Sequence, residues 1–141
     1  MRNRNTRGRN VGVTLMELMM VMTVISILAA IAIPSYRGYA LRASRADGKA
    51  AVLSMAGALE RCFTRFNAYN NAGCGITTSN VPSTEGKYLV SATFPTATTF
   101  TVSAVPQGTQ AKDTGCGTLT MNQANVRSKS GSKSVAECWG R

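Results

Sequence analysis

An apolar run close to the N-terminus constrains this chain more than any other feature. Residues 13–33 contain one charged side chain, Glu17, and their other polar side chains are Thr14, Thr23 and Ser26. At about 1.5 Å per residue, a helix of this length is roughly 30 Å long, which matches the hydrocarbon core of a bilayer. We therefore expect one helix that spans a membrane.

The residues before this run predict its orientation. Four arginines, Arg2, Arg4, Arg7 and Arg9, lie in the first nine residues, and Glu17 is the only charge inside the run. Positive charge stays on the cytoplasmic side, so we expect the C-terminal part across the membrane. A cleaved secretory signal is the alternative, with small residues at 29–32 as its cleavage site. The helical pattern continues past Pro34, which argues against that alternative.

Composition excludes several classes of chemistry. The chain of 141 residues has no histidine, six Asp or Glu and a net charge of +10. Without histidine there is no Ser-His-Asp or Cys-His catalysis and no His-ligated metal. We expect no catalytic residue, metal site or cofactor, and we do not expect an enzyme. The excess of positive charge favours a solvated basic surface and a topology signal over a nucleic-acid partner.

The helical pattern continues beyond the apolar run and becomes amphipathic. Pro34 is expected to kink the helix. Over residues 35–66, one apolar stripe is formed by Val52, Met55, Leu59, Phe63 and Phe66. These spacings of three and four place the stripe on one helical face, where a small domain can pack. Cations lie largely on the other faces, at Arg42, Arg45, Lys49 and Arg61, and breakers at residues 67–75 end the helix.

After residue 85 the pattern alternates with a period of two. Residues 88–94 and 100–104 predict two strands, and residues 95–98 predict the hairpin loop between them. A third strand is expected at 118–121 and a fourth near 125–128, followed by a solvated loop to residue 134. We therefore expect an α+β fold, in which a long N-terminal helix packs against a small antiparallel sheet.

Four cysteines, Cys62, Cys74, Cys116 and Cys138, allow three different disulfide pairings. Their spacing contains no C-x-x-C pair, and a zinc site would need all four. A C-terminal part outside the cytoplasm favours disulfides over free thiols.

Two segments carry a family resemblance. The sequence Gly12-Val13-Thr14-Leu15-Met16-Glu17 and the helix exit Ile31-Ala32-Ile33-Pro34-Ser35-Tyr36 resemble the N-terminal region of type IV pilins. The resemblance implies that residues 1–12 are a cleaved leader, that Val13 becomes an N-methylated N-terminus, and that Glu17 acts in assembly. Residues 13–34 would be the transmembrane and assembly helix, residues 35–66 its amphipathic half, and residues 67–141 the globular domain. Val13 departs from the usual Phe or Met.

The C-terminal part narrows the resemblance. Residues 100–104 lead to the segment 113–122, which contains Cys116, and the chain closes near Cys138 and Trp139. This is similar to PilE-type minor pilins, and it implies a Cys116–Cys138 disulfide, which leaves Cys62 to pair with Cys74. The implied function is a pilus subunit for twitching motility or adhesion. The implied partners are other pilins, the prepilin peptidase and the assembly machinery of the bacterial inner membrane, before display on the surface pilus.

The sequence leaves three alternative functions, each with a feature that argues against it. A type II secretion pseudopilin resembles the same family but often has acidic calcium loops, whereas only Asp113 and Glu137 follow Glu85 here. A DNA-uptake pilin would use the basic surface, yet aromatic and basic residues are not interleaved in any compact stretch. A membrane-anchored enzyme lacks a nucleophile paired with a base.

Overall fold

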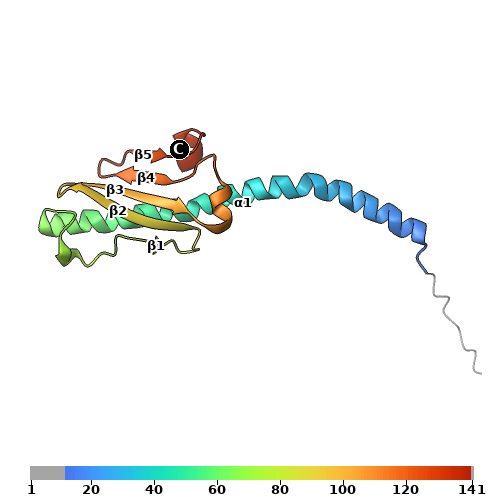
Figure 1. Ribbon diagram of the computed structural model, residues 1–141, viewed down its shortest axis with the longest axis horizontal. Helices are drawn as coiled ribbons and strands as arrows, with labels where there is room; N and C mark the ends of the chain where they lie inside the picture. The colour runs from blue at the N-terminus through green and yellow to red at the C-terminus, as the bar shows by residue number, and fades with distance from the viewer. Residues whose placement is uncertain (1–11, 141) are drawn as a thin grey trace, which may run out of the picture. The chain divides into compact units, whose positions relative to one another are not determined.

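The computed structural model describes residues 12–140, and the chain divides into two units after Gly38. One helix, α1 (Leu15–Phe66), runs through the described part of the first unit and continues into the second (Figure 1). Pro34 lies inside α1, and the helical assignment continues through it. The kink at Pro34 therefore stays a prediction.

In the first unit, hydroxyl side chains are accommodated by local hydrogen bonds. Thr23 Oγ1 donates to the Met19 carbonyl at 2.8 Å and Ser26 Oγ donates to the Met22 carbonyl at 2.7 Å. Such bonds satisfy a polar side chain within its own helix, so it can face an apolar environment. This part of α1 is long and apolar enough to cross a membrane.

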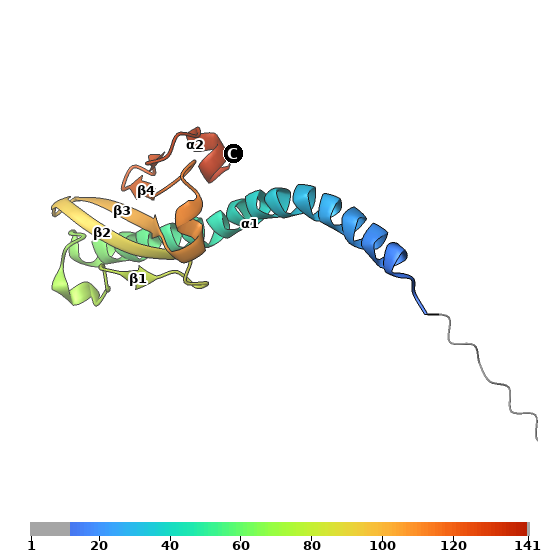
Figure 2. The same cartoon turned by 45° about the vertical axis from the view of Figure 1, so that its right-hand side comes forward.

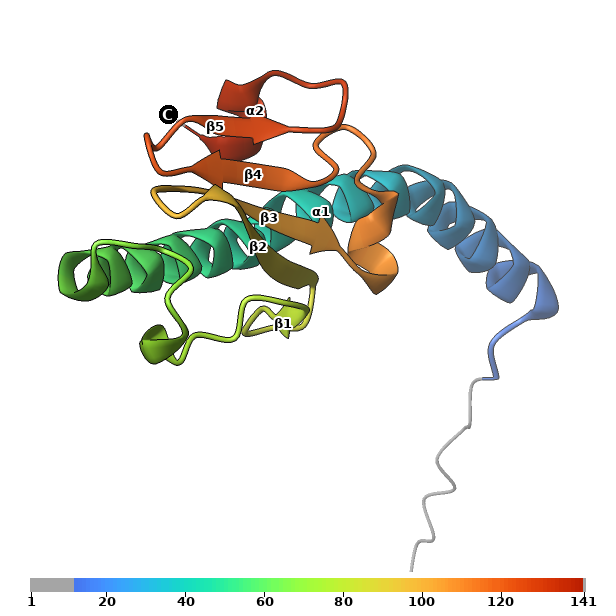
Figure 3. The same ribbon diagram turned by 60° about the vertical axis from the view of Figure 1, so that its left-hand side comes forward.

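The second unit is a five-stranded antiparallel sheet packed on the C-terminal part of α1 (Figures 1 and 3). The strands follow chain order across the sheet: β1 (Val81–Pro82), β2 (Tyr88–Thr96), β3 (Thr99–Pro106), β4 (Leu119–Asn122) and β5 (Arg127–Lys129). Short helices complete the unit: η1 (Ala72–Cys74), η2 (Gly108–Lys112) and α2 (Val135–Trp139). The predicted fold class is therefore confirmed.

The core forms between one sheet face and one helix face. Alternate residues of β2, β3 and β4 point inward, and the largest fully buried side chains among them are Tyr88, Val90, Phe100, Val102 and Leu119. The helix contributes Val52, Met55 and Leu59, as its stripe predicts. Phe66 is the exception: it is 37% exposed, because it is the last residue of α1. Arg45 is the opposite exception, since it is buried beside Asp113.

Several boundaries differ from the sequence predictions. Strand β2 continues through Pro95, so the hairpin turn contains only Ala97 and Thr98 (Figure 2). The strand register shifts between Thr93 and Thr96, and a proline is tolerated at such an irregularity because it has no N–H to donate. Part of the predicted loop at 128–134 belongs to β5. The sequence analysis missed β1, both 3-10 helices and α2.

Gly48 of α1 lies against the Tyr88 ring of β2 and gives a direct test of the packing. A Cβ added at Gly48 would lie 2.8 Å from the Tyr88 ring, whereas one added at Gly57 would meet only the end of the Arg61 side chain at 3.6 Å. We expect Gly48→Ala to destabilise by about 1–3 kcal/mol through overpacking. Gly57→Ala should stabilise by about 0.5–1 kcal/mol, because alanine is the better helix former. Thermal unfolding of the detergent-solubilised chain, followed by circular dichroism, measures both; equal behaviour of the two variants would contradict the packing.

Candidate assembly site and C-terminal disulfide loop

The N-terminal end of α1 brings the predicted processing and assembly residues into one short segment. Gly12 and Val13 are exposed and precede the helix. Thr14 caps it: the Glu17 backbone N–H donates to Thr14 Oγ1 at 3.2 Å, and the Leu18 N–H donates to the Thr14 carbonyl at 3.1 Å. Glu17 therefore lies in the first helical turn, where the helix dipole favours negative charge. The Thr-x-x-Glu spacing is the signal from which this cap could have been predicted.

The apolar side chains at the start of α1 are not packed against other described parts of the chain. Within residues 13–33, the large apolar side chains are between 50% and 79% exposed. An apolar surface of this extent marks a contact with membrane or with other proteins. The first unit is therefore built for an environment that the chain does not itself provide.

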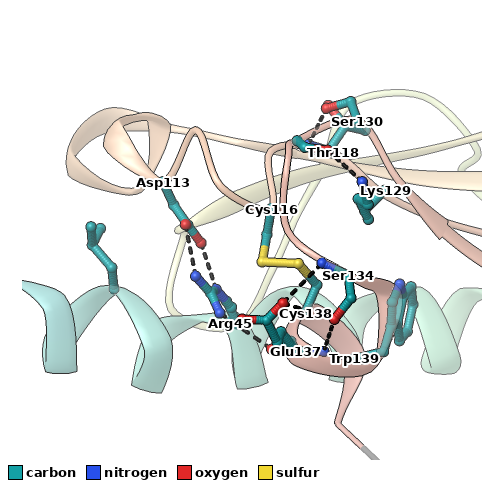
Figure 4. The surroundings of a disulfide bond; sticks show 12 residues. Arg45, Asp113, Cys116, Thr118, Lys129, Ser130, Ser134, Glu137, Cys138 and Trp139 are labelled. Atoms are coloured by element: carbon teal, nitrogen blue, oxygen red, sulfur yellow. Dashed lines mark hydrogen bonds and ion pairs between the residues drawn. A yellow bond between two sulfur atoms is a disulfide. The ribbon is translucent and has the colours of Figure 1, made fainter.

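A buried ion pair connects α1 to the segment before the C-terminal loop (Figure 4). Arg45 Nε donates to Asp113 Oδ2 at 2.6 Å and Nη2 donates to Oδ1 at 2.8 Å, with both side chains at most 6% exposed. Gln110 Nε2 adds contacts to Asp113 Oδ2 at 3.3 Å and to the Tyr88 hydroxyl at 3.0 Å. The hydrogen bonds that Arg45 donates to the Asp113 carboxylate raise the pKa of Arg45, and burial raises the pKa of Tyr88.

The loop closed by Cys116 and Cys138 is attached to the same helix face. Their Cα atoms are 5.5 Å apart, and the disulfide joins the segment before β4 to α2 (Figure 4). Arg45 Nη1 donates to the Glu137 carbonyl at 3.4 Å and Lys49 Nζ donates to the Trp139 carbonyl at 3.3 Å. Two cations one turn apart on α1 therefore satisfy carbonyls at the C-terminal end of α2, which would otherwise lack partners.

Helix α2 is defined by its own end residues. Ser134 and Glu137 form a reciprocal capping box, and the hydrogen bonds from Ser134 lower the pKa of Glu137. The capping box therefore contributes to folding stability above the ordinary glutamate pKa, and this stability is lost as the pH falls through the lowered pKa of Glu137. Trp139 Nε1 donates to the Ser128 carbonyl at 2.9 Å, and the Arg127 guanidinium lies 5.4 Å from the Trp139 ring centre.

The second disulfide joins Cys62 to Cys74, with Cα atoms 5.4 Å apart. It connects the last turns of α1 to η1, and Cys62 is buried. The Cys116–Cys138 disulfide has the pairing that the resemblance implied, and Cys62–Cys74 is the pairing that it left. Within residues 12–140, no group of three metal-ligating side chains lies close enough together to hold an ion.

Two family models match the chain. The model described as "Type IV minor pilin ComP, DNA uptake sequence receptor" matches residues 34–120, and the prokaryotic N-terminal methylation motif matches residues 9–33. The first match covers more than half of the chain. The chain therefore belongs to the type IV minor pilin family that this model describes.

Curated relatives are fimbrial proteins. The chain is 39% identical over 75 residues to the type IV major fimbrial protein FimA of Dichelobacter nodosus, covering 53% of this chain and 48% of that protein. It is 33% identical over 82 residues to a fimbrial protein of Neisseria meningitidis serogroup B, covering 57% of this chain and 47% of that protein. The chain thus spans about half the length of the curated relatives it matches. A solved type IV pilin from Shewanella oneidensis aligns with 28% identity and a TM-score of 0.49, over 62% of this chain and 89% of that one.

The Arg45–Asp113 pair should behave as a buried pair whose partners depend on each other. We expect Arg45→Met alone to destabilise by about 3–5 kcal/mol, because it leaves the Asp113 carboxylate buried without its cation. The double variant Arg45→Met/Asp113→Leu should recover most of that loss. Denaturant unfolding of the solubilised protein measures the free energy of unfolding of each variant. Equal decreases in the single and double variants would show that the charge pairing is not what holds the loop.

Proposed function

We propose that this chain is a type IV pilus subunit that is held in the inner membrane, processed, and then incorporated into the filament through the first unit. The observation that carries the proposal is the exposed apolar stretch of α1, which begins directly after a capped first turn that contains Glu17. Before assembly the bilayer covers this surface, with the globular unit in the periplasm. After assembly the corresponding stretches of other pilins cover it.

Processing is proposed between Gly12 and Val13. Both residues lie outside α1, and among residues 12–140 no atom lies within 4 Å of a Cβ built at Gly12, which would let a prepilin peptidase reach the backbone there. The methylation motif matches residues 9–33 and therefore spans this bond. Val13 would become the new N-terminus and carry the methyl group. Cleavage removes the four arginines of the leader, which leaves the apolar stretch free to move out of the membrane.

The role proposed for Glu17 follows from its surroundings in the assembled state. A carboxylate among apolar side chains needs a partner of opposite charge. The sequence has no Lys or Arg from residue 10 to residue 36, and processing would create an amine at Val13, four residues before Glu17. The amine of a neighbouring subunit is the proposed partner, and this pairing would favour one axial register between subunits.

Glu17→Gln tests the proposed function, because it keeps the size of the side chain and removes its charge. We expect the variant to be inserted and oxidised normally but about tenfold depleted from sheared filaments, as expected when one buried charge loses its partner. Glu85→Gln, an exposed carboxylate in the globular unit, is the matched control. Immunoblots compare the membrane and filament fractions, and mass spectrometry should find the filament form beginning at a methylated Val13. Normal incorporation of Glu17→Gln would contradict the role of the charge.

A second function, binding of double-stranded DNA, is favoured by one observation: the matched family is described as a DNA uptake sequence receptor. The sequence alone disfavours a nucleic-acid partner. The globular unit nevertheless has three cations within seven residues, Arg127, Lys129 and Lys133, without an acid between them. These residues lie outside the matched segment 34–120. We propose them as phosphate contacts if the chain binds DNA.

The double variant Lys129→Gln/Lys133→Gln tests this second function in fluorescence anisotropy with labelled duplex DNA. Removing two phosphate contacts should weaken binding about tenfold at low salt and reduce the slope of log K against log salt by about 2. Arg61→Gln/Arg65→Gln removes the same charge at another site and should retain the wild-type slope. Identical salt slopes for both variants would place the DNA contacts elsewhere.

A further inference from the structure

Two arginines near the C-terminal end of α1 form a site that the steps above do not use. Arg61 and Arg65 are one helical turn apart, both exposed, and neither makes an ion pair within residues 12–140. They line a hollow of about 300 Å³. Its remaining wall is formed by Ala58, Phe66, Ile76 and the Cys62–Cys74 disulfide.

Local structure explains only part of this arrangement. Arg65 lies in the last turn of α1, where the helix dipole favours a cation. Arg61 gains less from the dipole and is repelled by Arg65 at the i,i+4 spacing. The acid next to it, Glu60, is engaged elsewhere, because the Tyr69 hydroxyl contacts both of its oxygens at 3.1 and 3.2 Å. Two guanidinium groups are therefore left without a counter-charge above an apolar floor.

The chemistry of the hollow defines its ligand. Guanidinium groups bind carboxylates through paired hydrogen bonds, and an apolar floor strengthens such bonds by excluding water. The disulfide between Cys62 and Cys74 fixes one wall to the other. We propose that Arg61 and Arg65 dock a carboxylate-bearing segment of a neighbouring pilin of a different kind. This proposal rests on the proposed function as a filament subunit.

The charges of the globular unit argue against a second copy of this chain as the partner. From residue 39 onward the sequence has 11 Lys or Arg and 5 Asp or Glu. Asp47 and Asp113 are buried, and Glu137 is engaged in the α2 cap. Among the described residues from 39 to 140, Glu85 is the exposed carboxylate side chain that makes no hydrogen bond, and Lys87 follows it two residues later. Two such units repel each other, whereas a neighbour with an acidic surface complements this one.

A crosslinking experiment identifies the partner. The variant Arg61→Lys/Arg65→Lys keeps the positive charge and introduces amines that a carbodiimide can couple to a carboxylate in direct contact. Sheared filaments from this strain are treated with carbodiimide, and the crosslinked peptides are sequenced by mass spectrometry. We expect position 61 or 65 joined to an Asp or Glu of another pilin. A link to Glu85 of a second copy, or no link at either position, would overturn the proposal.

Reversing the charge of both arginines is a second test of the site. Arg61→Glu/Arg65→Glu should lower the ratio of filament to membrane protein about tenfold, as the loss of a close intersubunit charge pair does. Arg42→Glu, another exposed arginine on α1 outside the hollow, should stay within about twofold of wild type. Equal ratios for the two variants would refute the site. Absence of the wild-type chain from filaments would instead refute the proposed function, so the two failures are distinguishable.

Discussion

The apolar side chains at the start of α1 have no partners within their own chain, and each proposed step of function depends on what covers them. A bilayer and a bundle of neighbouring helices are both apolar, so the same surface is compatible with the precursor and with the filament. Local hydrogen bonds satisfy the polar groups of this surface. The Thr23 and Ser26 hydroxyls donate to carbonyls of their own helix, and the Thr14 side chain caps the first turn. Glu17 carries the one side-chain charge in residues 13–33, and under the proposed function its pairing with a neighbouring subunit would favour one axial register.

The second unit has a different requirement, because its sheet and its C-terminal loop must be held on a helix that is largely small and polar. The Arg45–Asp113 pair, Gln110 and Lys49 connect α1 with η2 and α2. The Cys116–Cys138 disulfide then joins α2 to the segment that contains Asp113. The loop is therefore held twice, once by the disulfide and once by Arg45, which contacts both Asp113 and the Glu137 carbonyl next to Cys138.

Periodicity was sufficient to predict the elements of this fold that bury a regular face. The stripe of Val52, Met55 and Leu59 and the alternation in β2 and β3 are visible in the sequence because each contacts the same core. Periodicity assigns Arg45 to a face other than the apolar stripe and does not predict its burial, because that burial depends on Asp113, which is distant in sequence. The α2 cap at Ser134 and Glu137 was detectable as a capping box but lay in a segment that composition marks as loop. For the candidate site, the motif from Gly12 to Glu17 was readable from sequence, whereas the hollow beside Arg61 depends on where Ile76 and Cys74 come to lie.

The two edges of the sheet limit how this molecule can associate. Strand β1 has only two residues, one of them Pro82, and α2 lies beside β5 with the Trp139 indole bonded to the Ser128 carbonyl. An edge that is short, interrupted by proline or covered cannot add strands from another molecule. The described sheet therefore offers no open edge for amyloid-like stacking of strands. Under the proposed function, filament contacts would be made by helices and surface side chains, which can be made and broken one subunit at a time.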